Sequence, residues 1–336
     1  MGDQSGHSVL LCGFLFLFTF AAVLPAAADE AAQEYDGELI LKSYLHTFPE
    51  KITGVEKVSP PVSAGASGAT SVSSDGEWII RLGNEAYYWA GGRLLPLSLL
   101  DQKDSWAPHD FSPYPAYAPS PAEYRREDIE RIRRESSVEA RLAQDNRYYG
   151  FFMALYGGAT EKEAQSLLTR INFLGRQIRV NAGIAAALER IDKAINLLAA
   201  GDSSLKAFLD TLASVECFAW REIRSKRQMS LHSWGIALDM LPKDQRSKAI
   251  YWLWEQNRND NWMMVSPERR WQPHPAVISA FENEGFVWGG KWELYDNMHF
   301  EYRPELHEMN RMSAAQNSSP VKPGSAQDIP HLMPFR

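Results

Sequence analysis

A regular stripe of apolar residues is the feature that most constrains the fold. It consists of Ile184, Leu188, Ile191, Ile195 and Leu198, which stand at i, i+4, i+7, i+11 and i+14. This spacing is that of one face of an α-helix, and such a helix must cover a core. Further along the chain, the patterns at residues 216–221 and 298–302 predict strands, and the pattern at 273–283 predicts a short helix. We therefore expect a mixed α+β fold.

The chain before this helix changes composition several times. Two β-prone runs, at residues 78–82 and 85–89, flank a Gly-Asn dipeptide and predict a hairpin. Residues 60–75 are rich in Pro, Ser, Gly and Ala and predict a linker. The five prolines of residues 108–121 predict an extended strap lying on a surface. From Ala122 the spacing becomes helical, including a predicted helix at 161–173.

The first residues determine where the protein acts. An apolar run at residues 9–24 is followed by Pro25 and three alanines, which predicts a signal peptide at residues 1–28, cleaved before Asp29. The first eight residues contain no Lys or Arg, so an uncleaved membrane anchor is an open alternative. In both cases we expect export to the periplasm or cell envelope. Cys12 lies inside the apolar run, which disfavours a lipoprotein.

The composition argues against an intramolecular disulfide and against nucleic-acid or membrane partners. Cleavage of the leader would leave Cys217 as the remaining cysteine, so no intramolecular disulfide could form. The chain has 45% apolar residues and 11 Trp, enough for a substantial core. Its net charge is −7 and its basic residues alternate with acidic ones, so we expect no nucleic-acid partner and no membrane contact beyond the leader.

Two short segments near the C-terminal end combine imidazoles and carboxylates. Residues 230–239 contain His232 and Asp239, and residues 296–301 contain Asp296 and His299. A catalytic zinc ion takes three protein ligands and keeps one position open, and His232, Asp239 and His299 make that number. Small residues between the first two would allow the backbone to turn there. Taken singly, a histidine is more often a surface or core residue than a ligand.

The order of these residues resembles a known family. The matching positions are Ser230-x-His232-x-x-Gly235-x-Ala237-x-Asp239, Trp288-Gly-Gly-x-Trp292 and Asp296-x-x-His299-Phe-Glu301. They resemble the zinc D-alanyl-D-alanine carboxypeptidases and L-alanyl-D-glutamate endopeptidases of the peptidase M15 family, in its C branch, which ends in Asp-x-x-His. The resemblance covers about residues 173–306. It implies a small antiparallel sheet with flanking helices that holds one zinc ion, as in the D-Ala-D-Ala carboxypeptidase and Hedgehog-like fold.

Residue roles follow from this resemblance. It implies that His232, Asp239 and His299 bind Zn²⁺ and that Asp296 is the catalytic base. Arg221 matches the family arginine that stabilises the oxyanion, with Arg224 and Arg227 as nearby competitors. Ser230 matches a serine that supports the site by hydrogen bonding. The domains we expect are a leader at 1–28, an N-terminal region with linker and hairpin at 29–121, a helical region at 122–172, a zinc peptidase domain at 173–308 and a disordered tail at 309–336.

The implied function is zinc-dependent hydrolysis of peptidoglycan stem peptides, with the D-Ala-D-Ala and L-Ala-D-Glu bonds as open alternatives. A carboxypeptidase needs a cation for the terminal carboxylate. Arg224, Arg227 and Lys291 are candidates, although solubility is the simpler explanation for them. The alternative function is a non-catalytic zinc-containing module that binds cell-wall peptides. Asp296 argues against it, because a structural zinc site has no use for a spare carboxylate.

Aromatic residues near these motifs allow two interpretations. Trp288 and Trp292 flank Gly289-Gly290 and could form a wall for substrate, but a packed turn is the simpler interpretation. The aromatic residues at 111–117 could bind glycan strands, while packing against the helical region is the more ordinary role.

Overall fold

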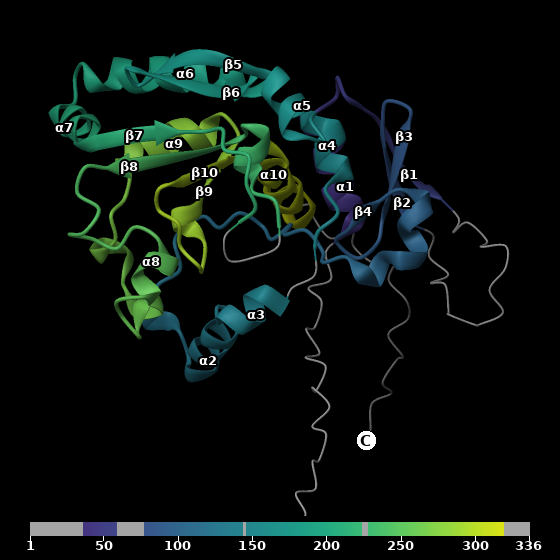
Figure 1. Cartoon of the computed structure of the whole chain (residues 1–336), viewed down its shortest axis with the longest axis horizontal. Coiled ribbons are helices and arrows are strands. Elements are labelled where there is room, and N and C mark those ends of the chain that lie inside the picture. Colours follow the sequence, from purple (N-terminus) through teal and green to yellow (C-terminus); the bar gives the residue numbers. More distant parts are fainter. Residues whose placement is uncertain (1–35, 59–76, 144–145, 224–227, 319–336) are drawn as a thin grey trace, which may run out of the picture. The chain divides into compact units, whose positions relative to one another are not determined.

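The computed structural model describes residues 36–58, 77–143, 146–223 and 228–318. One four-stranded antiparallel sheet has the order β7-β8-β10-β9 and carries the candidate site, so we call it the central sheet (Figure 1). Its strands are β7 (Leu212–Glu216), β8 (Ala237–Pro242), β9 (Phe286–Trp288) and β10 (His299–Tyr302). The strand predicted at 298–302 is therefore confirmed, and so is the mixed α+β class.

The strand predicted at 216–221 was wrong, because β7 ends where that prediction began. Glu216 pairs with Asp239 as the last rung of the β7–β8 ladder. After it the backbone leaves the sheet: Ala219 N–H donates to the His232 carbonyl, and the Arg221 carbonyl accepts from Ser230. Residues 217–221 thus pack along a turn rather than continue the strand.

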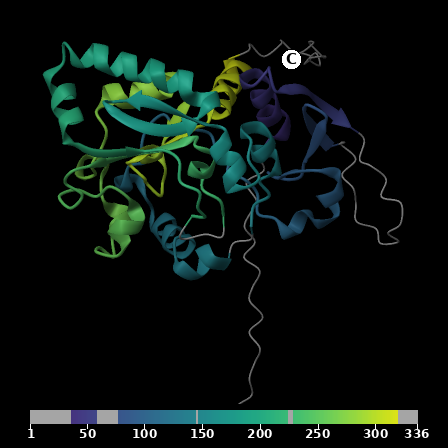
Figure 2. The same ribbon diagram turned by 45° about the horizontal axis from the view of Figure 1, so that its top comes forward.

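Helices and a hairpin cover one face of the central sheet. Helix α6 packs against α9 and against the β5–β6 hairpin (Figure 2). The bounds are β5 (Leu168–Phe173), β6 (Arg176–Asn181), α6 (Ala182–Ala199), α7 (Ser203–Thr211) and α9 (Pro275–Asn283). The two predicted helices are confirmed. Along α6 the stripe is buried from Ile184 to Ile195, whereas Leu198 in the last turn is 50% exposed.

The helix predicted at 161–173 is correct only in its first half. Thr160 caps α5 (Glu161–Ser166) through a capping box with Glu163. The chain then enters β5 and returns through Leu174 and Gly175, which both have positive φ, at 47° and 73°. Such a pair of residues forms a tight hairpin turn, so the second half of the segment is a strand.

The N-terminal region forms a second antiparallel sheet with the order β1-β2-β3-β4. The predicted hairpin is confirmed as β2 and β3, and Gly83 at the turn has φ 59°. The predicted linker at 60–75 lies outside the described residues. Helix α1 packs against α10. The bounds are α1 (Gly37–Thr47), β1 (Ile52–Val58), β2 (Glu77–Leu82), β3 (Glu85–Trp89), β4 (Leu94–Leu95), the 3₁₀ segment η1 (Leu97–Ser105) and α10 (Pro304–Ser318).

The strap at residues 108–121 contributes side chains to the core. It contains no helix or strand before Pro121, as its prolines predicted. Phe111 is fully buried, and the Tyr114 hydroxyl bonds Glu282 of α9 and the Trp288 N–H of β9. The predicted packing against the helical region is confirmed in part. The His109 ring of the strap contacts Tyr149 and Phe152 of that region, whereas the Tyr114 hydroxyl has its partners on α9 and β9.

Helix α2 of the helical region packs on a smaller second core, whereas α4 belongs to the main core. Ile132 of α2 joins Trp252, Trp262 and Tyr295 in that cluster, whereas Val138 and Leu142 are half exposed. The bounds are η2 (Pro121–Glu123), α2 (Arg126–Glu135), α3 (Val138–Ala143), α4 (Gly150–Tyr156), η3 (Leu231–Trp234), α8 (Trp252–Gln256), η4 (Trp262–Met264), η5 (Pro267–Arg269) and η6 (Gly289–Lys291). None of the helices in the described ranges is long and apolar enough to cross a membrane.

Two predicted terminal segments extend beyond these ranges. The leader at 1–28 lies outside the described residues. Helix α10 continues to Ser318 and so contradicts the first part of the disordered tail predicted at 309–336. The remainder of that tail lies outside the described residues.

Candidate metal centre

A short 3₁₀ turn, η3, carries His232 into the core. Ser230 caps this turn, and its Oγ accepts from the His232 N–H at 3.4 Å. Gly235 ends it with φ 64°, and a Cβ there would lie 2.8 Å from Leu168 and 2.9 Å from the Asn181 nitrogen. Only glycine fits this left-handed, crowded position. Ser230 and Gly235 therefore fix the direction of the turn.

The His232 ring presents an unpaired nitrogen. The side chain is 2% exposed, and its Nδ1 lies 2.5 Å from the Cys217 carbonyl. A carbonyl can only accept, so Nδ1 is the donor of this bond and Nε2 is the nitrogen left for another partner. This buried Nε2 has no hydrogen-bond partner, although Asp239 Oδ2 is 3.2 Å away. A cation between them would satisfy both atoms.

Strand pairing brings the other two candidate ligands together. Asp239 on β8 stands opposite His299 on β10, and paired residues of an antiparallel ladder share one face. Asp239 Oδ1 lies 2.8 Å from His299 Nδ1. One ligand atom each from His232, Asp239 and His299 lie within 4.8 Å of one another, so the three could hold a metal ion.

The charges of this cluster also suit a cation. Burial opposes ionisation of Asp239, but His232 and His299 outweigh it and hold the pKa of Asp239 well below its usual range. Burial favours a neutral His299, yet its bonds to Asp239 and Glu301 raise the pKa of His299 well above its usual value. A metal ion would replace the proton held there, as is usual when metals bind histidine and carboxylate ligands.

Asp296 lies beside this cluster on the loop before β10. Its N–H donates to the Gly289 carbonyl at 2.9 Å, and its carbonyl accepts from the His299 N–H at 3.2 Å. Its Oδ1 is buried without a hydrogen-bond partner. Burial, aided by the charge of Asp239 and opposed by His299, raises the pKa of Asp296 to about 7. Such a carboxyl can both accept and release a proton near neutral pH.

A glycine turn supports the Asp296 loop. A Cβ at Gly289 would lie 2.6 Å from the Asp296 carbonyl oxygen. Trp288 is 4% exposed, and its Nε1 donates to the Asn297 carbonyl at 2.9 Å. The predicted packed turn is thus confirmed. Trp292 differs from Trp288, because its ring lies 5.7 Å from the His299 ring, centroid to centroid, and flanks the cluster.

Arg221 is the cation nearest to the cluster among those proposed from sequence that lie in the described residues. Its side chain is 51% exposed, and its Nη2 lies 3.8 Å from Asp239 Oδ2. The Ser233 hydroxyl bonds the Arg221 backbone and so holds this loop. Arg224 and Arg227 lie outside the described residues. Lys291 is paired with Glu282 at 2.6 Å and covers the Tyr114 ring, so it does not face the cluster as a free cation.

Three contacts of the cluster had not been assigned from sequence. They are the Cys217 carbonyl on His232, the Ser233 hydroxyl on the Arg221 backbone, and the Glu301 carboxylate, whose Oε1 lies 3.0 Å from His299 Nε2. Strand alternation could have indicated Glu301, because residues i and i+2 share a face. The other two depend on the fold of a loop.

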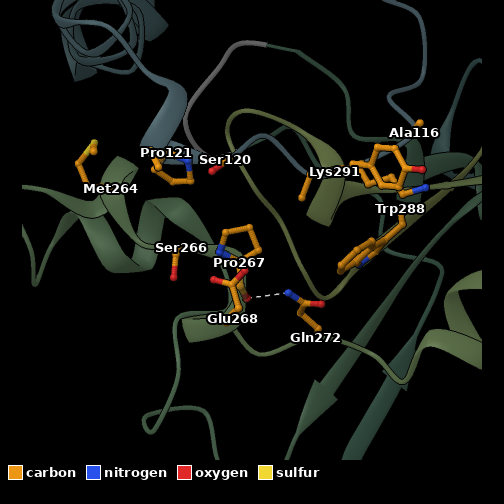
Figure 3. A pocket seen from close by; sticks show the side chains of 13 residues that line it. Ala116, Ser120, Pro121, Met264, Ser266, Pro267, Glu268, Gln272, Trp288 and Lys291 are labelled. Carbon is orange, nitrogen blue, oxygen red and sulfur yellow. Dashed lines mark hydrogen bonds between the residues drawn. The ribbon is translucent and has the colours of Figure 1, made fainter.

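A cavity of about 600 Å³ lies against the strap (Figure 3). Its walls come from the end of the strap and Ala122, from residues between 264 and 272, and from Trp288 and Lys291. Figure 3 shows Gln272 bonded to the Pro267 carbonyl on one side of it. Its lining includes neither the three candidate ligands nor Asp296.

Comparison with protein families gives two matches. Residues 224–302 match a family model described as D-alanyl-D-alanine carboxypeptidase, of the peptidase M15 group. This match supports a peptidase of the M15 family. It contains His232, Asp239, Asp296 and His299, whereas Arg221 precedes it. Peptidases of this family are zinc-dependent, in agreement with the candidate ligands.

The second match lies in the N-terminal region. Residues 41–111 match a domain of unknown function, DUF8518, which here runs from α1 to the strap. Searches of curated proteins and of solved structures gave no significant match.

Proposed function

We propose that this protein is a zinc peptidase that hydrolyses peptidoglycan stem peptides. One observation carries the proposal: a buried His232–Asp239–His299 cluster with an unpaired imidazole nitrogen lies beside the buried carboxylate of Asp296. The family match to D-alanyl-D-alanine carboxypeptidases supports it. Structural zinc sites close with four protein ligands, whereas three leave a position for reaction.

Each residue has a part in the proposed reaction. His232, Asp239 and His299 would hold the zinc ion, which when bound lowers the pKa of water and polarises a carbonyl. Asp296 Oδ1 would take a proton from the attacking water and later give it to the leaving amine. The Arg221 guanidinium would stabilise the negative charge that develops on the carbonyl oxygen. Ser230 would maintain the turn that carries His232.

We favour the D-Ala-D-Ala bond as the substrate, since the matched family model carries that description. The alternative is the L-Ala-D-Glu bond, for which the cluster would serve equally well. The pairing of Lys291 with Glu282 removes it from the cations available to a terminal carboxylate. Arg221 is half exposed and lies beside the cluster, so it could also contact that carboxylate.

The proposed substrate requires export. Peptidoglycan lies outside the cytoplasmic membrane, so the enzyme would act in the periplasm or cell envelope, in agreement with the leader predicted from sequence at residues 1–28.

Mass spectrometry of digested muropeptides tests the proposal. The purified protein is incubated with muropeptides, with and without a chelator, and compared with Asp296→Asn and with the exposed-residue control Asp260→Asn. Loss of a terminal D-Ala that the chelator prevents and zinc restores is the expected result, and cleavage after L-Ala would assign the endopeptidase. If the zinc-loaded protein cleaves neither bond, the peptidase proposal fails and the non-catalytic binding module takes its place.

A further inference from the structure

A row of buried polar side chains connects His299 to the N-terminal region. Glu301 Oε1 contacts His299 Nε2 at 3.0 Å, and Glu301 Oε2 lies 3.7 Å from Arg303 Nη1. The Arg303 Nε then bonds Glu305, and the Tyr44 hydroxyl of α1 donates to Glu305 Oε1 at 3.1 Å. We call these four residues, Glu301, Arg303, Glu305 and Tyr44, the charge ladder.

The strap contacts the same ladder from another direction. Arg303 Nη2 donates to the Asp110 carbonyl at 3.1 Å. Asp110 and Tyr44 both lie within residues 41–111, the segment that matches a domain of unknown function. That segment therefore contacts the ladder at two of its members, Arg303 and Glu305.

Burial restricts the conformations of the side chains that make these contacts. Arg303 is 8% exposed, Glu305 1% and Tyr44 0%. A buried charge is tolerated only when it is paired and hydrogen-bonded, so each member limits the conformations of the next. Glu301 uses one oxygen for His299 and turns the other toward Arg303. The position of Arg303 therefore sets the orientation of the carboxylate that holds the His299 ring.

We propose that residues 41–111 position the metal site, with Arg303 as the positioning residue that acts on His299 through Glu301. This inference rests on the proposed function, because it takes His299 as a metal ligand. It extends beyond the matched peptidase segment, which ends at residue 302 and contains neither Arg303, Glu305 nor Tyr44. It gives the N-terminal region a role within the enzyme.

The competing interpretation is an ordinary structural contact between two segments. That interpretation predicts a loss of stability with no change in the zinc affinity of the folded protein. A positioning role predicts weaker zinc binding by protein that is still folded. Partners that orient metal ligands contribute about 10- to 100-fold to metal affinity, which is large enough to separate the two interpretations.

The test uses the full chain and three variants. Arg303→Met/Glu305→Leu removes both buried charges together, which folded proteins tolerate better than removal of one. Tyr44→Phe removes one hydroxyl from the ladder. His46→Gln is the matched control, because His46 also joins α1 to α10, through Glu308 at 2.7 Å, without touching the ladder. Zinc affinity is measured by competition with a chelating dye, and circular dichroism shows that each variant is folded.

The expected result is a roughly 10- to 100-fold higher zinc Kd for the double variant, a smaller rise for Tyr44→Phe and none for the control. The kcat for muropeptide cleavage should fall in the same order. Wild-type zinc affinity in the folded double variant would overturn the inference and leave the proposed function intact, and so would an equal loss in the control.

A wild-type protein that binds no zinc would contradict the proposed function instead. The positioning of His299 is then decided on the metal-free proteins by NMR of the histidine ring nitrogens. Loss of the Nε2–H signal bonded to Glu301 in the double variant, with the signal retained in the control, supports positioning. An unchanged signal in both overturns it.

Discussion

Two buried histidines of this protein have opposite surroundings. His109 is 5% exposed, its Nε2 bonds the Tyr148 carbonyl, and the aromatic rings around it belong to Phe111, Tyr149 and Phe152. Burial, with a contribution from the positive charge of Arg147, lowers the pKa of His109 to about 3. It is a neutral core residue.

His299 is similarly buried, at 9% exposed, but both of its ring nitrogens face carboxylates. Its pKa is raised well above the usual value, although burial acts to lower it. The difference shows that burial alone does not make a histidine functional. Asp239 and Glu301 attract a cation to His299, whereas the aromatic rings around His109 do not attract one.

Removing a carboxylate ligand should abolish this contrast. We expect Asp239→Asn to raise the zinc Kd by more than roughly 100-fold, the upper range for a residue that only orients a ligand. The variant should show no measurable cleavage. His109→Gln, the matched change in the aromatic core, should keep zinc affinity and cleavage. Isothermal titration with zinc, followed by the muropeptide assay, measures both. Zinc binding that survives Asp239→Asn unchanged would contradict the ligand assignment.

The second expected effect separates the ligands from the base. Asp296→Asn keeps the size of the side chain but cannot accept a proton, so we expect the cleavage rate to fall by about 10²- to 10⁴-fold. Zinc affinity should stay close to that of the wild type, because Asp296 is not among the three ligands. Steady-state kinetics on zinc-loaded protein give the rate. If zinc affinity falls as far as in Asp239→Asn, Asp296 is a ligand and the assignment of a base is wrong.

A smaller effect is expected when Glu301, the second carboxylate on His299, is neutralised. Glu301→Gln preserves the shape of the side chain and weakens its hold on His299 Nε2. The zinc Kd should rise by about 10- to 100-fold, less than for Asp239→Asn. Glu56→Gln, which changes an exposed partner of Arg81 on the N-terminal sheet, is the control. Equal zinc affinities of the wild type and Glu301→Gln would show that Glu301 does not orient the ring.

Sequence patterns predicted the elements in which apolar and polar residues repeat at a regular spacing along the chain. The stripe from Ile184 to Ile195 and the alternation through β10 are of this kind, and both elements form as expected. His232, Asp239 and His299 were grouped by their ligand type and by the family resemblance, and the structure brings them together. The errors occurred where pairing with another segment decides the outcome. Leu168–Phe173 becomes a strand by pairing with β6, and Tyr114 is buried by Glu282 and Trp288.

The roles of neighbouring residues were harder to predict than the ligands themselves. His109 and His299 both have aromatic neighbours in sequence, and the family motif around His299 is what separates them there. Only the pairing of β8 with β10 places Asp239 beside His299, and only the strap places His109 among rings. The charge ladder spans 261 positions between Tyr44 and Glu305, so periodicity could not have revealed it.

The neutral His109 should also affect the stability of the folded protein in acid. The pKa of His109 is lowered in the folded state to about 3, against a usual value of about 6.5. Below pH 6.5 the unfolded chain binds a proton that the folded protein does not bind, so folding stability falls as the pH decreases from about 6.5 toward 3. The contribution is up to about 1.4 kcal/mol per pH unit. The positive charges of Arg147 and Arg303 also lower the pKa of His109.

His109→Gln should remove this dependence, because glutamine does not titrate and its amide can still donate to the Tyr148 carbonyl. Urea unfolding of the metal-free wild type and variant at several pH values from 7 to 4.5 measures the difference in slope. Carboxylates such as Asp239 contribute equally to both proteins and cancel. We expect the variant to be less stable than the wild type at pH 7, since it loses ring packing. Its stability should fall less for each unit by which the pH decreases. Parallel curves for the two proteins would mean that the pKa of His109 is the same in the folded and unfolded protein, and the contrast with His299 would then rest on the carboxylates alone.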